Sequence, residues 1–337
     1  MIPIDLGTLA LIALVAFMIA GALAPLETLG WWAGWYGDEV DAAEALAEAD
    51  TERAREAIYP AFERDDREYA RFIVYLSGIQ SVSDATYVGR EAQALEALRE
   101  ALPDTAVLEV FPYSVTNRAL TGQRVFSAFW RWALRGKVGQ RRLGQIAGFV
   151  INFRNLWQVG VSADRRYGPY YNRGSAQLIV QSLVRQGYRL GSGTPVTLVG
   201  YSGGGQVAVG AAPFVKEQTG GPVTVVSLGG VLAADPGLLE ADRVFHLYGR
   251  RDGVQRMGAL FFPGRWPVFG YSPWNQARQR GTLRIVPIGP SDHTGPGGYL
   301  DADARASDGR SYFQVTVDVL AAIVRGDADA LPVAQAP

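Results

Sequence analysis

The sequence lacks cysteine altogether and contains only two histidines among its 337 residues, His246 and His293. Without cysteine the chain forms no disulfide, offers no thiolate nucleophile and ligates no metal through sulfur. Two histidines also make a histidine-rich metal site unexpected. We therefore expect no metal site in this protein.

A net charge is nearly absent as well, because 32 basic residues face 33 acidic ones, which gives −1. This balance argues against nucleic acid as the main partner. The charges are unevenly distributed, since residues 118–173 contain eleven Arg and Lys and a single acidic residue, Asp164. We expect this basic segment to be an electrostatic unit of its own.

One long segment near the N-terminus has no charge, namely the 21 residues between Asp5 and Glu27. A helix that crosses a bilayer needs about 20 residues. Trp31 and Trp32 follow, as is typical of side chains at the lipid–water boundary. A secretory signal peptide is the alternative, but no Lys or Arg precedes the apolar run. We expect residues 1–37 to be a single-pass membrane anchor, and the flanking charges do not indicate its side of the membrane.

Small residues recur within this run, since Ala16, Ala20 and Ala24 are spaced four apart. This spacing lets two membrane helices approach closely, so a homo-oligomer formed through the membrane helix is a hypothesis. Residues 38–70 begin with a segment rich in Ala, Glu and Arg and predict a helical stalk or brace.

From residue 71 onward, short apolar runs alternate with helical patterns, which is the rhythm of a parallel βαβ sheet. The runs are almost wholly apolar, as expected for strands covered by helices on both faces. We expect an α/β core in residues 71–117 and 174–326, a cap insertion in 118–173 and a flexible tail in 327–337. Strands are predicted at 71–78, 105–113, 195–200, 222–230, 243–249 and 282–289, and helices at 89–102, 174–187, 205–218 and 311–324.

A glycine-rich segment, Gly200-Tyr201-Ser202-Gly203-Gly204, lies between a predicted strand and a predicted helix. A phosphate-binding loop of the Walker type requires a lysine after its glycines, and the dinucleotide pattern G-x-G-x-x-G does not match either. The segment does match G-x-S-x-G, a sharp turn that presents a nucleophilic serine at the tip of a strand. The positions two before and two after the serine must be small, and both are glycine. Ser202 is therefore the candidate nucleophile.

An acid and a histidine follow in the order that such a turn requires. Asp252 comes just after a predicted strand, and His293 lies in the loop after the last one. Asp235, after an earlier strand, is the substitute for the acid. His246 lies within a strand pattern and is interpreted as a core or strand-end residue, and Asp292 as an ordinary loop acid that points away.

With this motif and the order Ser202, Asp252, His293, residues 71–325 resemble the α/β-hydrolase superfamily of serine hydrolases. The resemblance implies an α/β fold with a mostly parallel sheet flanked by helices, and it places the insertion at 118–173 as a helical cap over the site. The first hairpin of strands that is usual in this superfamily is not evident here. We therefore expect a sheet reduced to six strands.

The resemblance also implies an oxyanion hole made of two backbone amides. One is the amide of Gly203 at the start of the following helix, where the helix dipole favours negative charge. The other comes from the loop after the early strand, where Ser77 and Gly78 occupy the place of a frequent His-Gly pair. We expect this donor to be Ile79, with Gln80 as the substitute.

Together these features predict a membrane-anchored serine hydrolase that cleaves carboxylic esters with an apolar portion and needs no cofactor. A thioesterase or an acyltransferase for lipid-like substrates uses the same groups, and a non-catalytic membrane scaffold is a further alternative. The aromatic and basic insertion at 118–173 has two interpretations. Its basic face contacts anionic lipid head groups, or its arginines pair with the acidic remainder of the protein.

Overall fold

The computed structural model describes most of the chain beyond residue 67: residues 68–79, 89–113, 142–328 and 331, together with Thr8, Leu11 and Val15. For residues 142–151 it describes the backbone alone. The expected anchor, most of the stalk, Gln80, the first part of the insertion and the end of the tail lie outside these residues, apart from the three N-terminal positions named. Within the described part of the chain, no helix is long and apolar enough to cross a membrane.

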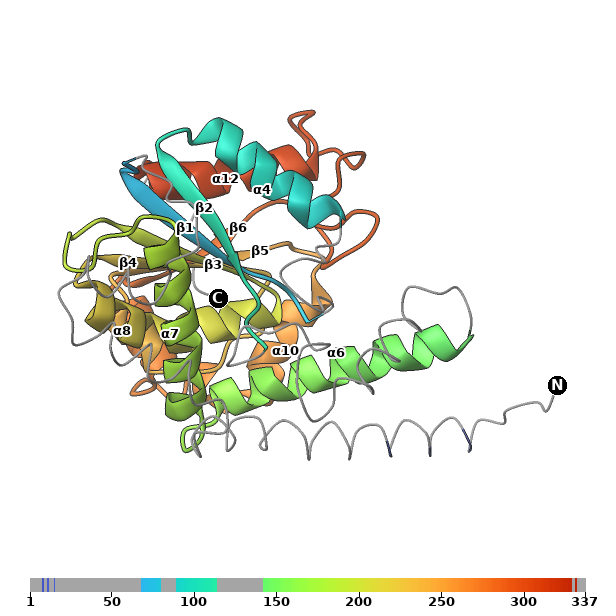
Figure 1. The fold of residues 1–337 in the computed structure, drawn as a ribbon. Helices are drawn as coiled ribbons and strands as arrows, with labels where there is room; N and C mark the ends of the chain where they lie inside the picture. The colour runs from blue at the N-terminus through green and yellow to red at the C-terminus, as the bar shows by residue number, and fades with distance from the viewer. Residues whose placement is uncertain are drawn as a thin grey trace.

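In the described part of the chain, six strands form one sheet in which every neighbouring pair is parallel, in the order β2-β1-β3-β4-β5-β6 (Figure 1). The prediction of a six-stranded parallel sheet flanked by helices is thus confirmed. The strands are β1 (Arg71–Leu76), β2 (Thr105–Val110), β3 (Val196–Tyr201), β4 (Val223–Leu228), β5 (Arg243–Tyr248) and β6 (Leu283–Pro287).

Helices connect these strands and cover both faces of the sheet. The described helices are α4 (Gly89–Ala101), α6 (Arg142–Ala163), α7 (Gly168–Arg185), α8 (Gly203–Thr219), α9 (Gly237–Glu240), α10 (Gly253–Phe261), the 3-10 helix η2 (Pro263–Arg265), α11 (Pro273–Gln279) and α12 (Tyr312–Arg325).

Alternate residues of each strand pack into different layers, as β1 illustrates. Phe72, Val74 and Leu76 belong to a core shared with α7 and α8, whereas Ile73 and Tyr75 belong to a core shared with α4 and α12. Figure 1 shows α4 and α12 together on one side of the sheet, with α7 and α8 on the other. Burial on both faces explains why the strands are apolar at nearly every position.

The strand order leaves a crevice at the carboxyl ends of β1 and β3. From β1 the chain goes to β2 on one side, while β3 pairs with the other side of β1. The helix that follows β3, α8, covers one face, and α4, between β1 and β2, covers the other. Connections therefore diverge at this point, which is where ligands bind in open parallel sheets.

The boundary between the predicted insertion and the core falls inside α7. The pattern predicts this helix from residue 174, but it begins at Gly168. Pro169 lies in its first turn, a position whose missing N–H costs no helical hydrogen bond. The described part of the insertion is helical, because it consists of α6, a short turn and the start of α7.

Two helices after β5, α10 and α11, were not predicted. Each starts at a residue whose side chain accepts backbone hydrogen bonds from the first turn: Asp252 for α10 and Ser272 for α11. Such capping satisfies N–H groups that have no partner within the helix. Asp252 is thereby fixed in place by local structure.

Candidate active site

The turn between β3 and α8 holds Ser202 in an unusual backbone conformation. Its φ of 53° and ψ of −122° make it the only residue other than glycine with positive φ among those described. The Ser202 N–H donates to the Leu228 carbonyl at 2.9 Å, and the Ser202 carbonyl accepts from the N–H of Gly205 at 3.1 Å. A side chain in this conformation costs about 1–3 kcal/mol, which the surrounding contacts must offset.

Glycine is required on both sides of the turn, as the sequence motif predicts. A Cβ at Gly200 would overlap the carbonyl of Gly204, and a Cβ at Gly204 would overlap the carbonyl of Leu76. Both obstacles are backbone atoms, so neither can rotate away. The tight contact between β3, α8 and β1 brings Ser202 to the carboxyl end of the sheet.

The structure brings the three predicted residues Ser202, His293 and Asp252 together. His293 Nε2 lies 2.8 Å from Ser202 Oγ, and His293 Nδ1 lies 2.8 Å from Asp252 Oδ2. These residues are separated by 91 and 41 positions in the sequence. An ionised carboxylate only accepts hydrogen bonds, so Nδ1 carries the proton and Nε2 is free to accept the hydroxyl proton of Ser202.

The Asp252 carboxylate is fully buried and receives four hydrogen bonds. Oδ1 accepts from the N–H groups of Val254 and Gln255, while Oδ2 accepts from His293 and from the Tyr299 hydroxyl at 2.5 Å. Burial by itself raises the pKa of Asp252, but the bonds from His293 and Tyr299 outweigh it and hold the pKa below its ordinary value. The group therefore stays ionised.

Two tyrosines position the imidazole of His293. The Tyr201 hydroxyl donates to the His293 carbonyl at 2.6 Å, and the two rings stack at 5.8 Å. Tyr299 bridges the Asp252 carboxylate and the N–H of Gly249, which donates to the Tyr299 hydroxyl at 2.8 Å. Tyr201 belongs to the recognised motif, whereas no sequence pattern indicated Tyr299.

The two expected oxyanion donors, Gly203 and Ile79, lie next to each other. A Cβ at Gly203 would come within 2.8 Å of the Ile79 side chain, and Gly78 lies beside Tyr201 and Ser202. The Gly203 N–H is in the first turn of α8, where backbone donors have no acceptor within the helix. Ile79 lines the same cavity as Ser202, and Gly203 directly follows Ser202, while the substitute Gln80 lies outside the described residues.

Side chains that the sequence did not indicate hold this loop. Asn155 in α6 donates to the Ile79 carbonyl at 2.7 Å, and the Tyr113 hydroxyl donates to the Ser77 carbonyl at 2.9 Å. Tyr113 is fully buried. Helix α6 of the insertion is therefore in direct contact with the loop that follows β1.

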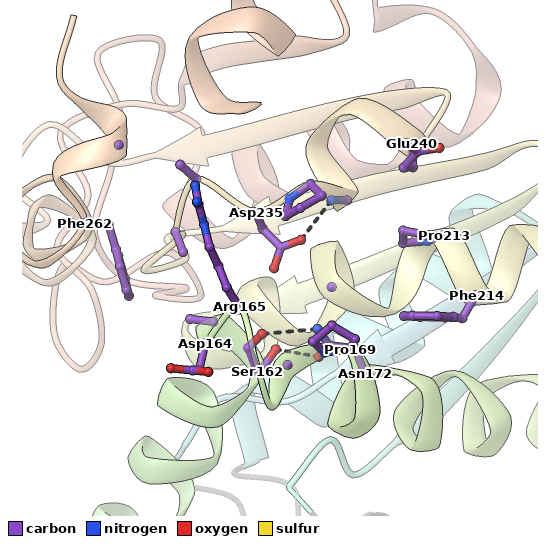
Figure 2. A pocket seen from close by; sticks show the side chains of 18 of the residues that line it. Ser162, Asp164, Arg165, Pro169, Asn172, Pro213, Phe214, Asp235, Glu240 and Phe262 are labelled. Atoms are coloured by element: carbon purple, nitrogen blue, oxygen red, sulfur yellow. Dashed lines mark hydrogen bonds between the residues drawn. The ribbon is translucent and has the colours of Figure 1, made fainter. Parts of the chain in front are cut away.

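The other candidates lie elsewhere. His246 is buried in β5, where Nδ1 is 3.2 Å from Ser227 Oγ, and burial lowers its pKa to about 3, so that it is neutral. Asp235 lies in a second cavity of about 630 Å³ (Figure 2) and accepts a hydrogen bond from Gln206 at 2.9 Å. Asp292 Oδ2 faces Arg251 Nε at 3.9 Å. The carboxylate that accepts the hydrogen bond from His293 Nδ1 is therefore that of Asp252 and not that of either of these acids.

Ser202 and His293 open into a cavity of about 510 Å³. Its described walls include the apolar side chains of Ile79, Val254 and Leu300, as well as polar groups from α4 and from the loop after β6. A cavity of this size and mixed lining is typical of a small-molecule site. The described residues contain no cluster of histidine and acidic side chains able to hold a metal ion.

Comparison with known proteins adds no family assignment, because neither the family models nor the curated proteins searched give a match to this chain. The structure places a strained serine, an imidazole and a buried carboxylate in one hydrogen-bonded chain that ends at a cavity.

Proposed function

We propose that the protein is a serine hydrolase of the α/β-hydrolase type that cleaves carboxylic esters. The observation that carries this proposal is the pair of 2.8 Å contacts linking Ser202, His293 and Asp252 at the tip of β3. Backbone strain of this kind clusters at functional sites, and a serine hydrogen-bonded to a histidine that contacts a buried carboxylate is the arrangement of an activated nucleophile. The six parallel strands, and the diverging connections at the carboxyl ends of β1 and β3, also support a hydrolase of this type.

The reaction proceeds in two halves. His293 Nε2 takes the proton of Ser202 as Oγ attacks the ester carbonyl, and the Asp252 carboxylate stabilises the imidazolium. The N–H groups of Gly203 and Ile79 stabilise the oxyanion. The imidazolium then protonates the departing alcohol, and water, deprotonated by the same imidazole, hydrolyses the acyl-enzyme. No step requires a metal or an organic cofactor.

The apolar walls of the cavity, Ile79, Val254 and Leu300, favour a substrate with an apolar portion. We further propose that residues 1–37 anchor the protein in a membrane, on the basis of their uncharged run and the tryptophans that follow. Anchoring would concentrate the enzyme near lipid-like esters and membrane lipids, and pairing of the anchors would give a homo-oligomer.

The test is labelling of the detergent-solubilised full chain with a fluorophosphonate, followed by peptide mapping, together with a chain-length series of p-nitrophenyl esters. We expect Ser202 alone to be labelled. Both Ser202→Ala and His293→Ala should lower ester turnover by about three orders of magnitude or more. Ser307→Ala is the matched control, because Ser307 is exposed on a loop away from the cavity lining.

Other outcomes distinguish the alternatives. A higher rate with added alcohol and a new ester product would identify an acyltransferase, and a preference for acyl thioesters would identify a thioesterase. Absence of both labelling and turnover in the folded protein would refute the hydrolase proposal and favour a non-catalytic scaffold.

A further inference from the structure

The cavity beside Ser202 contains an acidic side chain that the proposed chemistry does not use. Glu91 lies in the first turn of α4 and lines the same cavity as Ser202 and His293. Only 6% of Glu91 is exposed. Acidic residues are almost never buried to this degree unless a partner compensates for the lost hydration.

The contacts of Glu91 satisfy one of its two carboxyl oxygens. The Tyr75 hydroxyl, from β1, donates to Oε2 at 2.8 Å. Within the described chain, Oε1 accepts no hydrogen bond and no basic side chain forms an ion pair with Glu91. The neighbouring Arg90 is directed elsewhere, since its Nη1 donates to the Gly295 carbonyl at 2.9 Å. Oε1 is therefore an acceptor available to a molecule in the cavity.

The surroundings make this carboxyl group sensitive to a ligand. Burial raises the pKa of Glu91 to about 7, the Tyr75 hydrogen bond lowers it, and the negative charge of Glu109 on β2 raises it. Among the described residues, Tyr201, His293 and Arg90 are the other titratable groups that line the cavity, and Tyr113 lies close enough to be affected by the charge of Glu91. A cation bound at Oε1 would supply the missing partner and favour the ionised form.

We propose that Glu91 is a specificity-determining residue that selects esters carrying a protonated amine, which it binds through Oε1 while the scissile carbonyl lies at Ser202. This inference rests on the proposed hydrolase function and narrows its substrate class. The apolar residues Ile79, Val254 and Leu300 contact the carbon chain between the two ends. The substrate is thus amphipathic, with an ammonium at a distance from the ester bond.

The test compares p-nitrophenyl esters of four matched acids in several chain lengths, namely ω-amino, ω-hydroxy, ω-carboxy and unsubstituted alkanoates. At the best chain length, we expect kcat/KM for the ω-amino ester to exceed that of its unsubstituted isostere by about tenfold or more, because a charge-assisted hydrogen bond replaces an unfilled acceptor. The ω-hydroxy ester should fall between them. Dividing the two kcat/KM values cancels every effect that is common to both substrates.

Glu91→Gln should reduce the ω-amino preference, which is the ratio of kcat/KM for the ω-amino ester to kcat/KM for the unsubstituted ester, to near one. Arg90→Gln is the matched control next to it and should keep the preference or increase it. Tyr75→Phe should keep the preference but move its onset to higher pH. The hydrogen bond from Tyr75 lowers the pKa of Glu91, so its loss raises that pKa and the carboxyl group ionises at higher pH. Tyr75→Phe therefore tests the same carboxyl group if Glu91→Gln does not fold.

Three results would overturn the inference while leaving the hydrolase intact. They are equal turnover of the ω-amino ester and its unsubstituted isostere at every chain length, equal preference for the ω-hydroxy and ω-amino esters, and a preference for ω-carboxy esters that Arg90→Gln abolishes. Absence of turnover for every ester, with no fluorophosphonate labelling, would instead overturn the hydrolase proposal and this inference with it.

Discussion

The strained turn at Ser202 makes a prediction about stability that is independent of catalysis. Ser202→Gly and Ser202→Ala both remove the hydroxyl that lies 2.8 Å from His293 Nε2. They differ in the Cβ, which at φ 53° and ψ −122° crowds the backbone. Comparing the two variants with each other therefore isolates the energy of that crowding.

The expected difference follows from two opposing effects. Relief of the strained conformation favours glycine by about 1–3 kcal/mol. The greater freedom of glycine in the unfolded chain disfavours it by about 0.5–1 kcal/mol. Ser202→Gly should therefore be more stable than Ser202→Ala by about 1 kcal/mol. For a domain of roughly 150–250 residues this corresponds to a Tm about 2–4 °C higher.

The assay is urea unfolding followed by circular dichroism, with midpoints compared at equal m-values. A matched pair, Ser182→Gly and Ser182→Ala, serves as the control in the last turn of α7, where φ is negative and alanine should be the more stable by up to about 1 kcal/mol. The difference in stability between the glycine and alanine variants should therefore have opposite signs at Ser202 and Ser182. If Ser202→Ala equals or exceeds Ser202→Gly in stability, the conformation is not strained and the reasoning fails.

Three further predictions concern the surrounding residues. Tyr299→Phe removes the hydroxyl that donates to Asp252, so Asp252 loses one of its four hydrogen bonds. In steady-state kinetics, kcat should fall about tenfold and KM should stay unchanged. A change in KM alone would contradict this role. Gly204→Ala should destabilise the fold by about 1–3 kcal/mol in urea unfolding, since its Cβ meets the Leu76 backbone, whereas Gly89→Ala, in open space, should not. Between pH 4.5 and about 7, Glu91 is protonated in the folded protein but ionised in the unfolded chain. The free energy of unfolding of the wild type should therefore fall as pH rises through that window. Glu91→Gln should remove this slope and gain up to about 3 kcal/mol relative to wild type between pH 4 and 8, and parallel profiles for the two proteins would contradict the raised pKa.

The sequence by itself determined the order and type of the main elements. Strands buried on both faces must be apolar throughout, and this local pattern located all six. The G-x-S-x-G segment indicated the turn at Ser202 because close backbone packing tolerates only glycine at its two flanking positions, which is a constraint visible within five residues. Chain order then selected Asp252 and His293 as candidate partners.

Only the tertiary structure decided which side chains meet. The contacts of His293 span 91 and 41 residues, and those that Tyr113, Asn155 and Tyr299 make around the site span 36, 76 and 47. No local periodicity encodes such pairs, because they depend on where the loops cross at the carboxyl edge of the sheet. Glu91 illustrates this most clearly. In the sequence it is an ordinary acidic residue in a helical first turn, and only the packing of α4 against β1 desolvates its carboxyl group and places it in the cavity of Ser202.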